Sequence, residues 1–141
     1  MMLKDFLQRV VPSAGGNFWG GFIDPQGTYH QRTYHDLDAL VAFIESQTRQ
    51  RRDVYFATGV YNGPRKSKLT AGKKALYVDL DCGHGKPYGT QKEALKALLQ
   101  WSKDHFTLPS IIVNSGGGVH AYWTFTHVVA LSQWQPVAEQ F

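Results

Sequence analysis

The chain has 141 residues, of which 43% are hydrophobic and 18% are charged. This composition is typical of a globular domain with its own core and excludes a disordered chain; no apolar run is long enough to span a membrane. The formal net charge is only +4, and the single cysteine, Cys82, excludes an internal disulfide and fits a reducing cytoplasm. We therefore expect residues 1–141 to form one domain.

The first half of the chain predicts a helix, a hairpin and a second helix. Residues 1–12 carry apolar side chains at helical spacing and end at a proline, so they predict an amphipathic helix rather than a signal peptide. Residues 18–23 and 28–33 predict a hairpin around the turn sequence at 24–27. Asp36 predicts the N-cap of a helix whose apolar residues follow at i, i+3, i+4 and i+7.

The second half predicts strands at residues 54–60, 75–81, 110–114 and 119–125. Thr90 and Glu93 form a capping box for a helix that runs to about His105, and the tail from Ser132 is helical. Several strands follow one another without an intervening helix. This order predicts an α/β (α+β) fold with a mixed, largely antiparallel sheet, helices on one face and a polar opposite face.

Two carboxylates end the strand at 75–81. Because side chains alternate along a strand, Tyr77, Asp79 and Asp81 share one face, while Leu76 and the other apolar residues share the core face. Two adjacent carboxylates repel each other unless a cation neutralises them, and oxygen pairs of this kind suit Mg²⁺ or Mn²⁺. The plain alternative is an edge strand that turns two aspartates to solvent.

A triple glycine, residues 116–118, separates the last two predicted strands and precedes His120. Glycines here permit backbone angles closed to other residues, and exposed N–H groups in such a turn can cradle phosphate oxygens. On the strand that follows, His120 and Tyr122 lie on the face away from the core. If this strand and the carboxylate strand share a sheet, His120 lies on the polar face with the aspartates.

Basic residues are concentrated between positions 65 and 74, in a stretch interrupted by glycine and proline. Such a loop suits contact with phosphate groups, although a solvated surface loop has the same composition. The residues are Arg65, Lys66, Lys68, Lys73 and Lys74.

These motifs resemble the archaeo-eukaryotic primase superfamily, in particular its phage and plasmid primase–polymerases and RepB-like primases. That family carries a strand ending in D-x-D and a segment S-G-G-G-h-H-x-Y-W; here they stand at residues 77–81 and 115–123. Residues 56–62 also resemble the segment that leads into the first motif. The resemblance covers about residues 54–126.

The resemblance implies a primase-core-like fold and a nucleotidyltransferase that makes primers on a single-stranded DNA template during phage or plasmid replication, in the cytoplasm of a bacterial host. A 3′-hydroxyl would attack the α-phosphate of an incoming NTP or dNTP. Asp79 and Asp81 would bind Mg²⁺ or Mn²⁺, and His120 would contact the triphosphate. Nucleotide contacts would also come from Ser115, Gly116, Gly117, Gly118 and Lys86; the basic residues at 65–74 and Tyr122 would contact nucleic acid or phosphate.

One departure concerns the third carboxylate of the family, which should follow on a later strand. After His120 the acidic residue available is Glu139, in a predicted helix. The resemblance therefore implies that the chain is the N-terminal portion of a catalytic domain, that activity is incomplete, and that helicase or other replication domains follow.

Other functions remain open on the residues alone. A non-catalytic nucleic-acid-binding module of a replication initiator would stack bases on exposed aromatics such as Tyr77 and Tyr122. A rolling-circle nickase would need two histidines where His120-Ala121-Tyr122 supplies one. A zinc site at Cys82 and His84 is disfavoured because structural zinc usually takes several cysteines; we expect Cys82 to be a small core residue.

Overall fold

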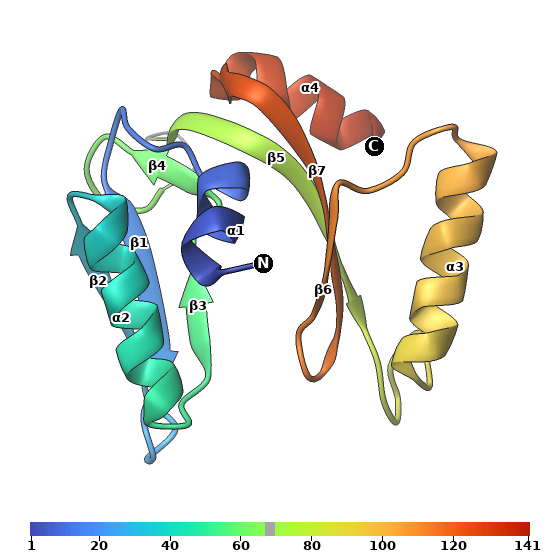
Figure 1. The fold of residues 1–141 in the computed structure, drawn as a ribbon, viewed down its shortest axis with the longest axis horizontal. Coiled ribbons are helices and arrows are strands. Elements are labelled where there is room, and N and C mark those ends of the chain that lie inside the picture. The colour runs from blue at the N-terminus through green and yellow to red at the C-terminus, as the bar shows by residue number, and fades with distance from the viewer. Residues whose placement is uncertain (67–69) are drawn as a thin grey trace. The chain divides into compact units, whose positions relative to one another are not determined.

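A computed structural model describes residues 1–66 and 70–141, and its elements are labelled in Figure 1. They are α1 (Leu3–Val10), β1 (Phe18–Ile23), β2 (Tyr29–Tyr34), α2 (Leu37–Arg49), β3 (Val54–Phe56), β4 (Gly59–Tyr61), β5 (Thr70–Asp81), α3 (Gln91–Asp104), β6 (Ile111–Asn114), β7 (Gly118–Val129) and α4 (Leu131–Gln140). The chain divides into two compact units, residues 1–74 with 125–141 and residues 75–124. The order of strands is β2-β1-β3 in one sheet and β4-β5-β7-β6 in the other.

The first unit is built on the predicted hairpin. β1 and β2 pair antiparallel along their whole length, and the Asp24 carboxylate accepts hydrogen bonds from the backbone N–H groups of Gln26 and Thr28. Gly27 has φ +84°, the left-handed conformation that the turn needs and that glycine adopts without strain. β3 pairs antiparallel with the other edge of β1.

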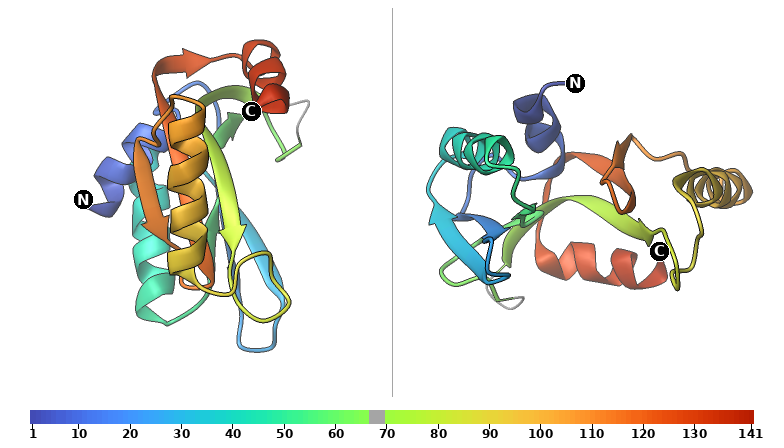
Figure 2. Two further views of the ribbon diagram at one scale, coloured as in Figure 1. Left: turned by 90° about the vertical axis from the view of Figure 1, so that its right-hand side faces the viewer. Right: turned by 90° about the horizontal axis from the view of Figure 1, so that it is seen from below.

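Helix α2 covers one face of this sheet. Asp36 caps it as predicted, accepting a hydrogen bond of 2.7 Å from the Ala39 N–H. Phe43 and Leu40 of the helix lie so close to Gly20 of β1 that a methyl group at this position would overlap the Phe43 ring. Helix α1 lies beside α2, as Figures 1 and 2 both show.

The strand predicted at 54–60 is wrong as a single element. Val54–Phe56 pairs with β1, whereas Gly59–Tyr61 pairs with β5 in the other sheet. The change of partner occurs at Ala57 and Thr58. Alternation of apolar residues signals an extended chain but carries no information about which strand lies alongside it. The same pairing with β4 extends β5 back to Thr70, five residues before the predicted start at residue 75.

The second unit contains the end of β5, helix α3, β6 and the first half of β7. Thr90 caps α3 by accepting a hydrogen bond from the Glu93 N–H, as predicted. Trp101 of the helix packs edge-on against Trp123 of β7, with ring centroids 6.0 Å apart, so α3 covers the core face of these strands. β6 and β7 pair antiparallel.

The predicted α+β class is confirmed, and the sheets are antiparallel. The pairs β1–β2, β1–β3, β4–β5 and β6–β7 all run antiparallel, and a parallel contact occurs as an isolated bridge between Cys82 and Tyr88. The described part of the chain contains no helix that combines the length and apolar character needed to cross a membrane.

Candidate functional site

The two carboxylates of β5 lie on the same exposed face, as predicted. The side chains of Asp79 and Asp81 are 52% and 58% exposed, whereas Leu80 between them and Val78 before them are half-buried. Alternation along the strand produces this division, because successive side chains point to opposite faces. The aspartates are therefore free to bind a cation from solvent without losing contacts in the core.

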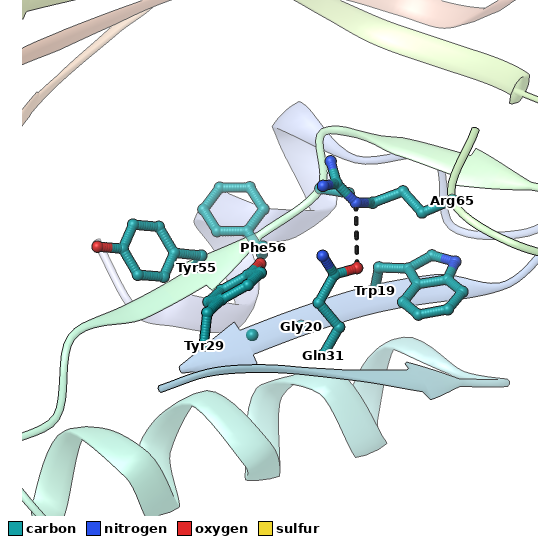
Figure 3. Close-up of a pocket in the computed structure, with 9 residues that line it drawn as sticks. Trp19, Gly20, Tyr29, Gln31, Tyr55, Phe56 and Arg65 are labelled. Atoms are coloured by element: carbon teal, nitrogen blue, oxygen red, sulfur yellow. Dashed lines mark hydrogen bonds between the residues drawn. The ribbon is translucent and has the colours of Figure 1, made fainter. Parts of the chain in front are cut away.

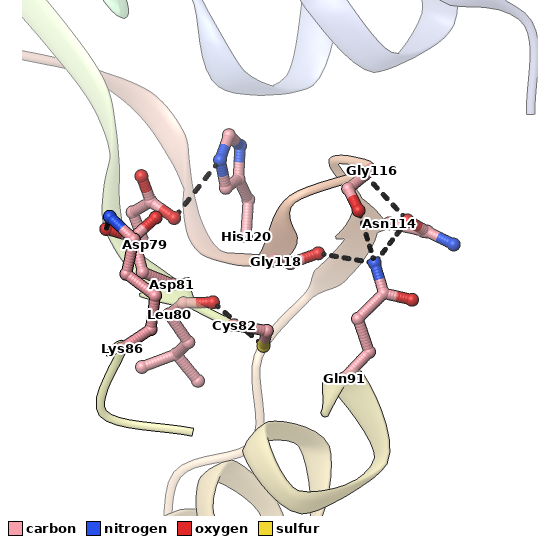
Figure 4. A network of polar contacts seen from close by, with 10 residues as sticks. All are labelled: Asp79, Leu80, Asp81, Cys82, Lys86, Gln91, Asn114, Gly116, Gly118 and His120. Atoms are coloured by element: carbon pink, nitrogen blue, oxygen red, sulfur yellow. Dashed lines mark hydrogen bonds and ion pairs between the residues drawn. The ribbon is translucent and has the colours of Figure 1, made fainter. Parts of the chain in front are cut away.

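His120 of β7 lies against the first of these carboxylates, as Figure 4 shows. Its Nε2 is 3.4 Å from Oδ1 of Asp79. The neighbouring residues of the same face, Tyr77 and Tyr122, stack with their ring centroids 6.0 Å apart. The prediction that His120 shares the polar face of the sheet with the carboxylate pair is thus confirmed within the second unit.

Lys86 lies beside the second carboxylate, on the loop after β5. Its Nζ is 3.6 Å from Oδ2 of Asp81, and both side chains are more than half exposed. An ion pair this exposed contributes little to stability, about 0–1 kcal/mol. The loop is closed by hydrogen bonds from the Gly83 N–H to Tyr88 and from the Lys86 N–H to Gly83. Lys86 is accordingly positioned to leave Asp81 for an anionic ligand at low cost.

The carboxylates of Asp79, Asp81 and Glu93 produce a negative electrostatic potential at Cys82. Burial raises the pKa of the Cys82 thiol, and the charges of Asp81, Glu93 and Asp79 raise it further. The thiol therefore stays protonated, which disfavours a metal-binding thiolate. Cys82 is only half-buried, so the expectation that it is a core residue is wrong. Within the described ranges, no group of three or more His, Cys, Asp or Glu side chains is arranged to hold a metal ion. The Asp79–Asp81 pair, with oxygen donors, is the arrangement here that fits Mg²⁺ or Mn²⁺.

Tyr122 is buried, and the expectation that it is an exposed stacking residue is wrong. It is 3% exposed because Tyr77 of the adjacent strand covers it. Burial, followed by the influence of Tyr77 and Asp79, raises the pKa of Tyr122 to about 12. Tyr77 itself is 47% exposed. The aromatic surface of this face is therefore Tyr77, with Tyr122 supporting it from below.

The glycine turn between β6 and β7 has three different structural requirements. Gly116 has φ +88°, and a methyl group at Gly118 would overlap the Leu80 carbonyl oxygen, whereas Gly117 has open space around it. The N–H of Ser115 donates to the Gly118 carbonyl and that of Gly116 donates to Asn114 Oδ1. The N–H groups of Ser115 and Gly116 are therefore not available to a cradle, whereas the N–H of Gly117 has no protein partner within the described residues.

Two residues that were not predicted as site residues, Gln91 and Asn114, hold this turn in place. Gln91, at the start of α3, donates from Nε2 to Asn114 Oδ1 at 2.7 Å and to the Gly118 carbonyl at 3.1 Å (Figure 4). The Cys82 N–H donates to the Gly117 carbonyl at 3.0 Å and ties the same turn to the end of β5. The position of Asn114 directly before the Ser-Gly-Gly-Gly segment could have indicated its role in the sequence. No sequence pattern around Gln91 indicates that its side chain reaches this turn.

The predicted basic residues belong to the first unit and do not act as one group. Lys73 donates to Thr58 Oγ1 at 3.1 Å and lies over the Trp134 ring, and burial followed by the charge of Arg65 lowers its pKa. Lys74, on the other face of β5, donates to the Gln8 carbonyl at 2.6 Å. Lys66 is exposed, and Lys68 lies outside the described residues.

In chemical terms the second unit presents two exposed carboxylates, an adjacent imidazole, a lysine ammonium and one free backbone N–H. Carboxylates suit a divalent cation, and the imidazole, the lysine and the N–H suit the oxygens of a phosphate chain. Comparison of the chain with protein-family models, with curated proteins and with solved structures finds no match.

Proposed function

We propose that the chain is a metal-dependent nucleotidyltransferase of the primase–polymerase type, which binds an NTP or dNTP and makes primers on a DNA template in phage or plasmid replication. The observation that carries this proposal is the convergence of Asp79, Asp81 and His120 on one exposed sheet face. The resemblance of residues 77–81 and 115–123 to the primase motifs agrees with it.

In this proposal one set of residues would bind the metal and another would bind the nucleotide. Asp79 and Asp81 would hold Mg²⁺ or Mn²⁺, which supplies charge neutralisation for phosphoryl transfer. His120 and Lys86, released from their carboxylate partners, would donate to triphosphate oxygens, as would the Gly117 N–H. None of these groups needs to act as a covalent nucleophile, because the transfer depends on positioning and charge neutralisation.

A non-catalytic nucleic-acid-binding module is the second candidate, favoured by the exposed ring of Tyr77. Base stacking on an aromatic ring requires no divalent ion, so dependence of nucleotide binding on metal separates the two functions. The nickase is disfavoured because His120-Ala121-Tyr122 supplies one histidine where two are needed, and because Tyr122 is unsuited to act as its nucleophile. This residue is buried, and its raised pKa keeps the hydroxyl protonated and poorly nucleophilic.

Removal of divalent metal tests the proposed function directly. We expect calorimetric titration of the chain with dATP to show binding in Mn²⁺ and at least tenfold weaker binding in EDTA, because two carboxylates without a cation repel a triphosphate. Equal affinity with and without metal would instead support the non-catalytic module.

Replacement of His120 by alanine should weaken triphosphate binding by about tenfold or more and monophosphate binding much less. A hydrogen bond from an imidazole N–H to a charged phosphate oxygen is worth roughly 1.5–3 kcal/mol, and a monophosphate offers fewer oxygens at this position. Calorimetry with dATP and dAMP in Mn²⁺ measures the difference. His127→Ala, at an exposed histidine later on β7, is the matched control and should bind both ligands like the unaltered chain. Equal losses for both nucleotides with His120→Ala would point to contact with base or sugar.

A further inference from the structure

The face of the first sheet opposite to helix α2 carries an aromatic cavity, and none of the described residues that line it belongs to the carboxylate site. In the register of the sheet, Gly21 of β1 stands between Gln31 of β2 and Tyr55 of β3, so these three share a face. Trp19 and Tyr29 lie on the same face, opposite to the one that Phe43 and α2 cover. Figure 3 shows their side chains around the cavity.

The floor of this cavity depends on a glycine. A methyl group at Gly21 would overlap the phenol of Tyr29, so the ring lies directly over the backbone. Tyr29 and Tyr55 meet edge to face with ring centroids 5.8 Å apart, and each is 46% exposed. Two large aromatic rings thus remain accessible to solvent at one place, where burial against the core would be the usual arrangement.

The rim of the cavity is polar and positively charged. Arg65 reaches over it, with Nε donating to Gln31 Oε1 at 3.4 Å. Among the described residues that line the cavity, none is acidic. The guanidinium keeps donors that this one bond does not use, and the Gln31 amide has both a donor and an acceptor. The cavity therefore combines flat apolar walls with a guanidinium that can bind a phosphate. The amide of Gln31 can form hydrogen bonds with the polar edge of a heterocyclic ring.

The size of the cavity limits its occupant. Its volume is about 240 Å³, below the roughly 300–1,000 Å³ of pockets that enclose a drug-sized ligand. A single planar ring system fits better than an entire nucleoside triphosphate. A nucleobase in a strand supplies such a ring, together with a phosphate on its backbone for Arg65.

We propose that this cavity binds one base of a single-stranded nucleic acid, stacked on Tyr29 and Tyr55, with Arg65 on the adjoining phosphate. A duplex is excluded as the occupant because its bases are already stacked and paired. The inference rests on the proposed function only for the identity of the strand, which would be the template. The binding itself requires no metal.

Three single substitutions in the 141-residue chain test the proposal, with binding measured by fluorescence anisotropy in EDTA. The probes are a short labelled oligothymidylate and an abasic oligomer of the same length. Tyr55→Ala should weaken oligothymidylate binding about tenfold, as loss of a base–aromatic stack does, and leave abasic binding unchanged. Arg65→Gln should weaken both and reduce the slope of log affinity against log salt by about 0.7, the value for one phosphate contact on a single strand. Phe106→Ala, which removes an aromatic ring that is 96% exposed elsewhere, should change neither.

Thermal melting and circular dichroism of each variant establish that the fold is retained. Tyr55→Phe keeps the ring and should bind oligothymidylate like the unaltered chain, so it supplies a test even if Tyr55→Ala fails to fold. Equal losses of oligothymidylate and abasic binding with Tyr55→Ala, tighter binding of duplex than of single strand, or no oligonucleotide binding at all would each overturn the proposal. The double variant Asp79→Asn and Asp81→Asn should keep its metal-free oligonucleotide binding. Oligonucleotide binding at the cavity can therefore be observed even if the proposed catalytic function is wrong. Metal-dependent nucleotide binding can likewise be observed even if the cavity does not bind a base.

Discussion

Replacement of both Asp79 and Asp81 by asparagine is expected to abolish metal-dependent nucleotide binding, with a loss of more than about 100-fold. The two carboxylates are the oxygen donors at which Mg²⁺ or Mn²⁺ would bind, and an amide oxygen carries no charge to attract the ion. A factor of 100 corresponds to about 2.7 kcal/mol, a modest fraction of what a divalent ion supplies at a phosphate chain. Calorimetry with dATP in Mn²⁺ measures the effect.

The same double substitution should leave the fold intact. Both side chains are more than half exposed, and their partners Lys86 and His120 are 52% and 33% exposed, so each solvent-screened pair is worth about 0–1 kcal/mol. Removing the repulsion between two neighbouring carboxylates offsets part of that loss. We expect a change in the free energy of unfolding within about 1 kcal/mol. Asp53→Asn with Asp104→Asn, at two exposed aspartates that are not among the site residues, is the control for a change of two charges. Unchanged dATP binding by the site variant would refute the assignment of the metal ligands.

The part of the site that sequence predicts well is the part that depends on local alternation. Asp79, Asp81 and His120 were placed on one polar face because side-chain direction in a strand repeats every two residues, independently of distant contacts. The same rule applied over a longer strand would have separated Lys73 from Lys74. The glycines and proline around these two residues predict a loop, whereas pairing of β4 with β5 makes them extended, so they point to opposite faces.

What the sequence could not predict depends on contacts between distant segments. Tyr122 and Tyr77 are 45 positions apart, and nothing near either of them indicates that one ring covers the other. Gln91 reaches the glycine turn from the start of a helix. The aromatic cavity of the first unit is lined by residues from β1, β2 and β3 and by Arg65, which follows β4. Their proximity results from the strand order β2-β1-β3, which the sequence does not reveal. Register and strand order are set by the folded chain as a whole.

Substitution of a single glycine in the turn between β6 and β7 is expected to have a large effect on the free energy of unfolding. Gly118→Ala should destabilise the chain by about 2–3 kcal/mol, because its methyl group would overlap the Leu80 carbonyl oxygen and come 3.1 Å from the Leu80 carbonyl carbon. The obstacle is backbone and not the flexible end of a side chain, so relief requires β5 and β7 to separate. At about 3–4 °C per kcal/mol for a chain of this size, the melting temperature should fall by roughly 10 °C.

Its two neighbours serve as matched controls with the same chemical change. Gly117→Ala has open space and an ordinary φ, so its effect should stay within about 0.5 kcal/mol. Gly116→Ala also has space but must adopt φ +88°, at a cost of about 1–2 kcal/mol. Thermal melting of the three variants should therefore rank the loss as Gly118, then Gly116, then Gly117. Three equal losses would contradict this explanation, because they would mean that flexibility of the turn matters and close approach of Gly118 to the carboxylate strand does not. A stable Gly117→Ala variant also provides a test of phosphate approach: if the Gly117 N–H contacts the triphosphate, the added methyl should weaken dATP binding while melting is unchanged.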